Sequence, residues 1–234
     1  MSGYTWRAGD DLADDQGRIW LAVPWDDRQA VRRLGARWDG GRQQWFSPPG
    51  ASSLLMRWSV LPAKLEGEDR EFGAGLFVDL IPSTSWFTNV RSAVAPADWY
   101  RIRTMVYGRA GYRCEACGRA ADEASGLRLE AHERFSYETT RAGNIQELRR
   151  LLCLCSACHA VTHLGLADLR GERDAALGHL RAVTGMSAAR AAGHAAEAFA
   201  LWERRSRLRW ELDLRMIEAE GIELAAPAEA VSAR

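Results

Sequence analysis

The spacing of apolar positions predicts a small β-α-β-β module near the start of the chain. Apolar residues dominate residues 18–24, as in a short buried strand. Within residues 26–36 they recur at helical spacing, so one face of a helix should pack on the strands. Residues 37–48 are typical of a hairpin that turns at Gly40 and Gly41. We therefore expect an accessory module over residues 18–50.

The rest of the pattern predicts a second, larger domain. Strands are indicated by continuous or alternating apolar runs, and helices by apolar residues three or four apart. The expected strands are 76–81, 127–132 and 208–214, and the expected helices are 96–107, 166–183 and 187–205. We assign this domain to residues 76–223, with a flexible N-terminus at 1–17, a linker at 51–75 and a disordered tail at 224–234. The predicted fold class is α+β.

Four of the five cysteines form two Cys-x2-Cys pairs, Cys114 with Cys117 and Cys155 with Cys158. Two thiolates three residues apart hold half of a tetrahedral metal site, and a second such pair completes it. The spacing therefore predicts a structural Zn²⁺. The fifth cysteine, Cys153, lies in an apolar run and is interpreted as a core residue.

Three histidines accompany these cysteines. His132 lies near the end of the expected strand 127–132, whereas His159 directly follows Cys158 and His163 comes four residues later. In a helix, residues four apart project from one face, which suits a second metal ion. The alternative is that His159 and His163 are polar surface residues of a short helix. His179 and His194 lie far along the sequence and are excluded from the site.

The order of these motifs resembles the HNH endonucleases, whose ββα-metal unit is often stapled by a zinc ion on four cysteines. The resemblance covers residues 112–165. It implies that His132 is the general base, and that His159 and His163 bind a catalytic divalent ion, Mg²⁺ or a transition metal. It also implies that the protein hydrolyses phosphodiester bonds in nucleic acid, with DNA as the expected substrate.

Two positions depart from that family's pattern. Ala131 stands where the family carries a metal ligand, and Glu130 or Glu133 could supply the missing oxygen. Arg150 stands where the family carries an asparagine that holds the loop of the base. Asn144 or Gln146 could replace this tether.

The sequence of residues 21–46 is similar to a small domain of unknown function found in conjugative primases and other DNA-processing proteins. Two interpretations of its tryptophans are open. They supply the core of a very small domain, which we favour, or they form a surface that stacks unpaired bases. The residues concerned are Trp25, Trp38 and Trp45, with Arg32, Arg33, Arg37 and Arg42.

The amino-acid composition excludes few functions for this protein. The 31 basic and 31 acidic residues balance, so no overall charge attracts nucleic acid. No apolar stretch approaches the length of about 20 residues needed to cross a bilayer, so we expect no membrane partner and a cytoplasmic location. A homodimer is compatible with cutting two strands. The candidate nucleic-acid contacts are Trp86, Asn89, Arg91 and Arg150.

The leading prediction is thus a metal-dependent HNH-like endonuclease. The alternative is a non-catalytic, zinc-stabilised nucleic-acid-binding protein, and a third interpretation is a structural or protein-interaction domain. Uptake of a second metal ion distinguishes the first from the second, and salt-sensitive DNA binding distinguishes both from the third.

Overall fold

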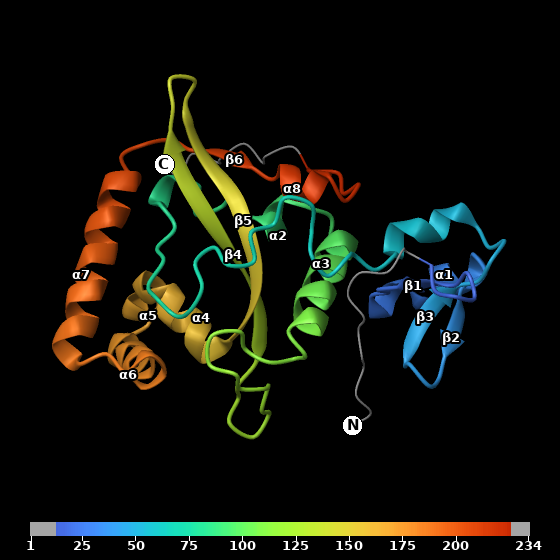
Figure 1. Ribbon diagram of the computed structural model, residues 1–234, viewed down its shortest axis with the longest axis horizontal. Helices are drawn as coiled ribbons and strands as arrows, with labels where there is room; N and C mark the ends of the chain where they lie inside the picture. The colour runs from blue at the N-terminus through green and yellow to red at the C-terminus, as the bar shows by residue number, and fades with distance from the viewer. Residues whose placement is uncertain (1–12, 226–234) are drawn as a thin grey trace. The chain divides into compact units, whose positions relative to one another are not determined.

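The computed structural model describes residues 13–225, which form two compact units (Figure 1). The first unit comprises the described part of residues 1–68, 90–111 and 215–234, and the second comprises residues 69–89 and 112–214. Most of the expected flexible N-terminus and disordered tail lies outside the described residues. Of that N-terminus, the described stretch contains a turn in which the Asp14 carboxylate accepts hydrogen bonds from the backbone N–H groups of Gln16 and Arg18.

The first unit contains the predicted β-α-β-β arrangement. Strands β1 (Ile19–Leu21), β2 (Arg37–Asp39) and β3 (Gln44–Ser47) form an antiparallel sheet in the order β1-β3-β2. The connection from β1 to β2 holds a 3-10 turn, η1 (Trp25–Asp27), and helix α1 (Arg28–Arg33). The sheet and its helix are confirmed as predicted.

The core of this sheet requires residues that we assigned to a linker. Helix η2 (Ser53–Trp58) buries Leu55 and Trp58 against Leu21 and Val31. The Trp58 indole N–H donates to the Asp27 carboxylate at 2.7 Å, which ties η2 to the start of α1. The linker prediction for residues 51–75 is therefore wrong at this end, because three short strands and one helix bury too little apolar surface alone.

The tryptophans predicted as core residues divide into two groups. Trp45 is half-buried against the core of the first sheet. Trp25 is 74% exposed and Trp38 is 44% exposed. For these two residues the core interpretation is wrong, whereas Trp58 of η2 is buried in this core.

Helices α2 (Val90–Ala93), α3 (Pro96–Arg109) and α8 (Arg215–Glu218) complete the first unit. Arg101 of α3 donates to the Ser59 carbonyl at 2.8 Å. Arg109 forms a buried, two-point ion pair with Glu68, both N–O distances being 2.7 Å. These contacts place α3 with the first unit, whereas the sequence assigned it to a domain at residues 76–223.

The second unit is built on a long hairpin. Strand β4 (Leu129–Thr139) pairs antiparallel with β5 (Asn144–Cys155), and β6 (Glu211–Asp213) adds to β5 in parallel. The register shifts between Arg134 and Phe135, which indicates a β-bulge.

The strand expected at residues 76–81 is not formed. Leu76, Val78 and Leu80 are buried, but the hydrogen bonds of this segment go elsewhere. The Val78 N–H donates to the His194 ring at 2.9 Å, and the Asp79 N–H donates to the Thr162 carbonyl at 3.0 Å. The segment is therefore an extended stretch anchored on helices, ending in the short 3-10 turn η3 (Ser83–Ser85).

Four helices follow the hairpin and lie on one side of it (Figure 1). They are α4 (Ser156–Thr162), α5 (Leu164–Leu169), α6 (Arg173–Thr184) and α7 (Ala188–Arg205). Leu152 and Leu154 of β5 pack with Val161, Leu164 and Leu180 from these helices. The Ser187 side chain caps α7 by accepting a hydrogen bond from the Arg190 N–H. Within residues 13–225, no helix has the length and apolarity of a membrane span.

Candidate metal centres

Four cysteine side chains converge in the second unit. The sulfur atoms of Cys114, Cys117, Cys155 and Cys158 all lie within 4.8 Å of one another, and the Cys117 and Cys155 sulfurs are 3.7 Å apart. Sulfurs held at about 2.3 Å from a tetrahedral zinc ion lie about 3.8 Å from each other. The cluster thus has the donor set and spacing of a structural zinc site, as the sequence predicts.

Local backbone structure places these sulfurs. The first pair lies in a tight turn before β4, where the Gly118 N–H donates to the Cys114 carbonyl at 2.8 Å. Gly118 has a φ of +74°, which side chains other than glycine rarely adopt. Cys155 ends β5, and Cys158 lies in the first turn of α4. The strand-to-helix junction therefore spaces the second pair.

Burial and mutual repulsion make four adjacent thiolates unfavourable without a cation. A hydrogen bond with Cys158 lowers the pKa of the Cys114 thiol to about 4, whereas burial raises the pKa of Cys155 to about 11. The pKa of Cys158 is raised as well, first by its hydrogen bond with Cys114. Four adjacent thiolates would repel one another, and a divalent cation bound by all four sulfurs would stabilise their charges.

Glu115 docks the first cysteine turn against β5. Its backbone N–H donates to the Cys153 carbonyl at 2.8 Å, and its carboxylate accepts from the Cys153 N–H at 2.6 Å. The same carboxylate accepts from Arg70 at 2.6 Å and from Arg150 at 3.2 Å. Arg150 is buried and also donates to the Phe72 carbonyl. Arg150 therefore holds the cysteine turn in place, which corrects its assignment as a nucleic-acid contact.

His179 joins the cysteine cluster although the sequence analysis excluded it. Its Nε2 lies 3.2 Å from the Cys158 sulfur, within range of an N–H···S hydrogen bond. The contact arises because α6 folds back onto α4, 21 residues later in the chain. A ring N–H that donates to a metal-bound thiolate orients it and reduces its charge. No local motif marks His179, so only the packing of the helices reveals it.

We expect His179→Ala to weaken zinc binding by about 10- to 100-fold without preventing the fold, because hydrogen-bond partners of ligands tune affinity on that scale. Competition with a coloured chelator measures this change. His179→Gln retains an N–H donor and should recover part of the loss. Unchanged zinc affinity in His179→Ala would show that the contact is packing alone.

Three histidine rings form a second cluster beside the first. His132 projects from β4, and His159 and His163 project from α4 and its C-terminal end, with candidate ligand nitrogens within 4.8 Å of one another. The ring centroids of His159 and His163 are 4.5 Å apart, and each lies 5.0–5.2 Å from that of His132. The structure thus unites the three histidines of the motif. His132 is, however, the fourth residue of a strand that continues to Thr139, not a residue near its end.

Burial keeps two of these imidazoles neutral. His132 is 1% exposed, and burial lowers its pKa well below the ordinary value, with further lowering by His163, Arg134 and His159. Burial also lowers the pKa of His163 to about 3. Among residues 13–225, neither ring nitrogen of His132 has a hydrogen-bond partner. A neutral imidazole with an available nitrogen can bind a metal or accept a proton.

Glu130 is the carboxylate that reaches this cluster. Its Oε2 lies 3.0 Å from the Nδ1 of His159, and the hydrogen bond with that ring lowers the pKa of Glu130. The contact leaves the Nε2 of His159 available to a metal. Glu133 and Ala131 alternate with His132 along β4, so they face the opposite side of the strand. Of the two predicted oxygen ligands, the structure brings only Glu130 to the histidines.

A buried arginine follows on the same face of β4. The Arg134 guanidinium donates to the Asp79 carboxylate at 3.0 Å and stacks on Phe77 at 4.0 Å. Its Nε and Nη2 atoms have no hydrogen-bond partner within residues 13–225. Its charge contributes to the low pKa values of His132 and His163. Arg134 was not predicted as a site residue, since an arginine in an alternating strand is ordinarily a surface residue.

The predicted nucleic-acid contacts after residue 81 belong to different elements. Trp86 is exposed, and its indole N–H donates to the Ile81 carbonyl at 2.9 Å while its ring stacks on Trp202. Asn89 is half-buried in the same unit. Arg91 belongs to α2 of the first unit. These residues therefore remain separate candidates.

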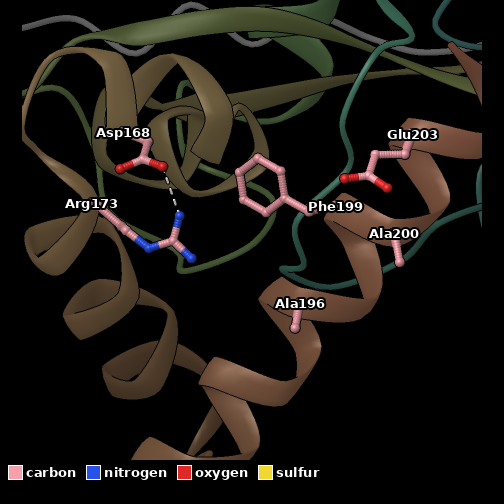
Figure 2. A pocket seen from close by; sticks show the side chains of 6 residues that line it. All are labelled: Asp168, Arg173, Ala196, Phe199, Ala200 and Glu203. Atoms are coloured by element: carbon pink, nitrogen blue, oxygen red, sulfur yellow. Dashed lines mark hydrogen bonds and ion pairs between the residues drawn. The ribbon is translucent and has the colours of Figure 1, made fainter.

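A surface hollow bordered by α5, α6 and α7 is distinct from both clusters (Figure 2). Arg173 pairs with Asp168 at 2.8 Å and lies over the Phe199 ring at 5.3 Å. Asp168 and Arg173 pair with each other, and we assign the hollow no chemical role. Its lining residues are Asp168, Arg173, Ala196, Phe199, Ala200 and Glu203.

Comparison with known proteins concerns the first unit. Residues 18–59 match a family described as a domain of unknown function (DUF5710). Over 44 residues the chain is 41% identical to the DNA primase TraC of Escherichia coli. That match covers 18% of this chain and 4% of the primase. No solved structure matches the chain.

The resemblance predicted for the N-terminal module is thus confirmed for the DUF5710 segment, residues 18–59. The family match extends past residue 50 to include η2. This agrees with the fold, in which η2 completes the core of the sheet. The family match ends before the second unit, where the two candidate metal clusters lie.

Proposed function

We propose that this protein is a metal-dependent, HNH-like endonuclease that hydrolyses phosphodiester bonds in DNA. The observation that carries the proposal is the convergence of His132, His159 and His163 beside the four-cysteine cluster. Helix α4 begins directly after Cys155, so the same strand-to-helix junction serves both clusters. The β4–β5–α4 order agrees with the ββα-metal unit that the sequence resembles.

In the proposed reaction, His159 and His163 hold a divalent ion, and Glu130 orients the ring of His159. A divalent ion bound by these residues would supply positive charge to the scissile phosphate and to the leaving 3′-oxygen. Neutral His132 accepts the proton of the attacking water, whose oxygen bonds to phosphorus as the bond to the 3′-oxygen breaks. The fixed charge of Arg134 adds to the positive potential of this face.

The donor set bears on the choice of ion. Imidazole nitrogens suit Zn²⁺, Ni²⁺ and other transition metals, whereas Mg²⁺ prefers oxygen ligands. The two proposed ligands, His159 and His163, are both imidazoles, and the nearby Glu130 carboxylate is engaged by His159. We therefore propose a transition metal ahead of Mg²⁺ as the catalytic ion.

DNA is proposed as the substrate because the DUF5710 segment is similar to part of a DNA primase. Cleavage of both strands of a duplex requires two active sites or two successive events. A homodimer satisfies this requirement and is part of the proposal.

The second candidate function is a non-catalytic, zinc-stabilised protein that binds nucleic acid. The deep burial of His132 favours it, because a general base must reach the water that it activates. His159, with a side chain 26% exposed, is the histidine more open to solvent. In this function the three histidines bind a second structural ion or none.

Cleavage of supercoiled plasmid and single-stranded circular DNA tests the proposal. We expect the purified chain to cut one of these substrates with Mn²⁺, Ni²⁺, Zn²⁺ or Mg²⁺, and His132→Ala to lower the rate by about 10²- to 10⁴-fold. A parent protein that leaves both substrates intact with every ion, while binding them, would support the second candidate. His132→Ala cutting at the parent rate would remove the base from the mechanism.

A further inference from the structure

Two indole rings of the DUF5710 segment are presented to solvent. Trp25 lies in η1 and Trp38 lies on the edge strand β2. Trp38 meets Trp45 edge-on, at 5.6 Å between ring centroids, so its position is held by the sheet. Exposed tryptophans are unfavourable for solubility, and surfaces that keep them are commonly binding surfaces.

Arginine guanidinium groups lie over aromatic rings in the same segment. The Arg28 guanidinium is 3.8 Å from the centroid of Trp25, and that of Arg42 is 4.3 Å from Trp20. Arg18 lies over both Trp20 and Phe46, at 4.9 and 5.3 Å. A guanidinium held over a ring is oriented in advance, so the side chains of Arg28 and Arg42 can meet a base or phosphate, whereas Arg18 already pairs with the Asp14 and Asp39 carboxylates.

The charge of the segment is opposite to that of the rest of the chain. Residues 18–59 contain seven arginines and three aspartates, a net charge of +4 in a chain whose net charge is zero. The other residues therefore carry a net charge of −4. Arg32, Arg33 and Arg37 are all exposed. The segment is a local positive region that attracts a polyanion.

We propose that the DUF5710 segment binds single-stranded nucleic acid, with Trp25 and Trp38 stacking on bases and the arginines contacting phosphates. Unpaired bases expose the π-faces that tryptophan stacks upon, whereas a duplex encloses them. A second copy of this segment is disfavoured as the occupant, because two surfaces of net charge +4 repel each other. Stacking does not discriminate between bases, because every base has a π-face. The proposed ligand is therefore a single strand of any sequence.

This inference does not depend on the proposed nuclease activity, because it concerns binding by a different unit. The experiment uses the full chain carrying His132→Ala, without added divalent ions, so that cutting does not interfere. Fluorescence anisotropy measures its affinity for a labelled 20-nucleotide oligodeoxythymidine at low salt. An oligouridine of the same length and a 20-base-pair duplex are the two comparison ligands.

We expect the double variant Trp25→Ala/Trp38→Ala to bind oligodeoxythymidine at least about tenfold more weakly than the parent. The reason is that each base stacked on an aromatic ring contributes to the free energy of binding. Leu54→Ala is the matched control, because Leu54 is 64% exposed in the same segment and has no stacking face. It should bind within about twofold of the parent. Circular dichroism of all variants checks that the fold is retained.

Equal binding of oligouridine supports the proposal, since bases and phosphates are common to both single strands. A double variant that binds oligodeoxythymidine as the parent does would overturn it, as would a preference of the parent for the duplex. If the parent protein cuts no DNA in the separate plasmid assay while oligodeoxythymidine binding is intact, that result would count against the proposed nuclease and leave this proposal standing.

Discussion

Cys155→Ala is expected to release the zinc ion and unfold the region around β5 and α4. Cys155 is fully buried at the junction of these elements, with its sulfur 3.7 Å from that of Cys117. Zinc binding contributes about 10 kcal/mol or more to the folding of small zinc domains, and a typical domain is stable by only about 5–15 kcal/mol. Metal analysis should show one zinc ion per chain in the parent and none in the variant, with a lowered melting temperature.

Cys153→Ala is the matched control for this prediction. Cys153 lies two residues away on β5 and is equally buried, but it is outside the four-sulfur cluster. Its replacement removes one small buried side chain, so we expect zinc retention and a modest loss of stability. Stoichiometric zinc in Cys155→Ala, or zinc loss in Cys153→Ala, would refute the ligand assignment.

His159→Ala and His163→Ala are expected to abolish uptake of a second metal ion while the cysteine-bound zinc stays. Both rings face His132 in one cluster, and neither contributes to the four-sulfur site. Under the proposed function, loss of either ligand lowers the cleavage rate by orders of magnitude, on the scale of about 10²-fold or more seen for catalytic groups. Calorimetric titration with Mn²⁺ or Ni²⁺ measures the second ion, and plasmid nicking measures the rate.

Variants of two glutamates in β4 distinguish a local effect on metal binding from a general loss of strand structure. Glu130→Gln removes the carboxylate that lies 3.0 Å from His159. We therefore expect this variant to bind the second metal ion more weakly than the parent does. Glu133→Gln changes the same residue type on the opposite face of β4, and its metal affinity should equal that of the parent. Retention of the second ion in His159→Ala, or equal effects of the two glutamate variants, would contradict a metal site on the histidines.

Local features were predictable from the sequence. Each Cys-x2-Cys pair is a unit of four residues, so its spacing alone places two sulfurs together. The β-α-β-β module was predictable because its strands and helix follow the apolar period of each element. The convergence of His132 with His159 and His163 was inferred from a motif whose hairpin and helix are adjacent in the chain. These inferences succeeded because the residues involved are close in sequence or in consecutive elements.

Contacts between distant segments were decided by the tertiary structure. His179 reaches Cys158 because α6 folds back on α4, and Arg150 is buried because Glu115 of the first cysteine turn docks on it. The alternation of β4 selects Glu130 over Glu133, since only one of them shares the face of His132. Trp25 and Trp38 are exposed, whereas Trp58, from a segment that appeared to be a linker, is buried in the core of the first sheet.

The sequence by itself determined the chemistry available to this protein: two thiol pairs, three clustered imidazoles and a positive N-terminal segment. The tertiary structure decided which of these groups are buried, paired or exposed. The physical reason is that each side chain carries its own metal-binding or hydrogen-bonding groups, and each segment carries its own spacing of apolar residues. Both can be read without knowing the fold. Burial and partnership depend on which segments pack together, and that choice is made by the fold as a whole.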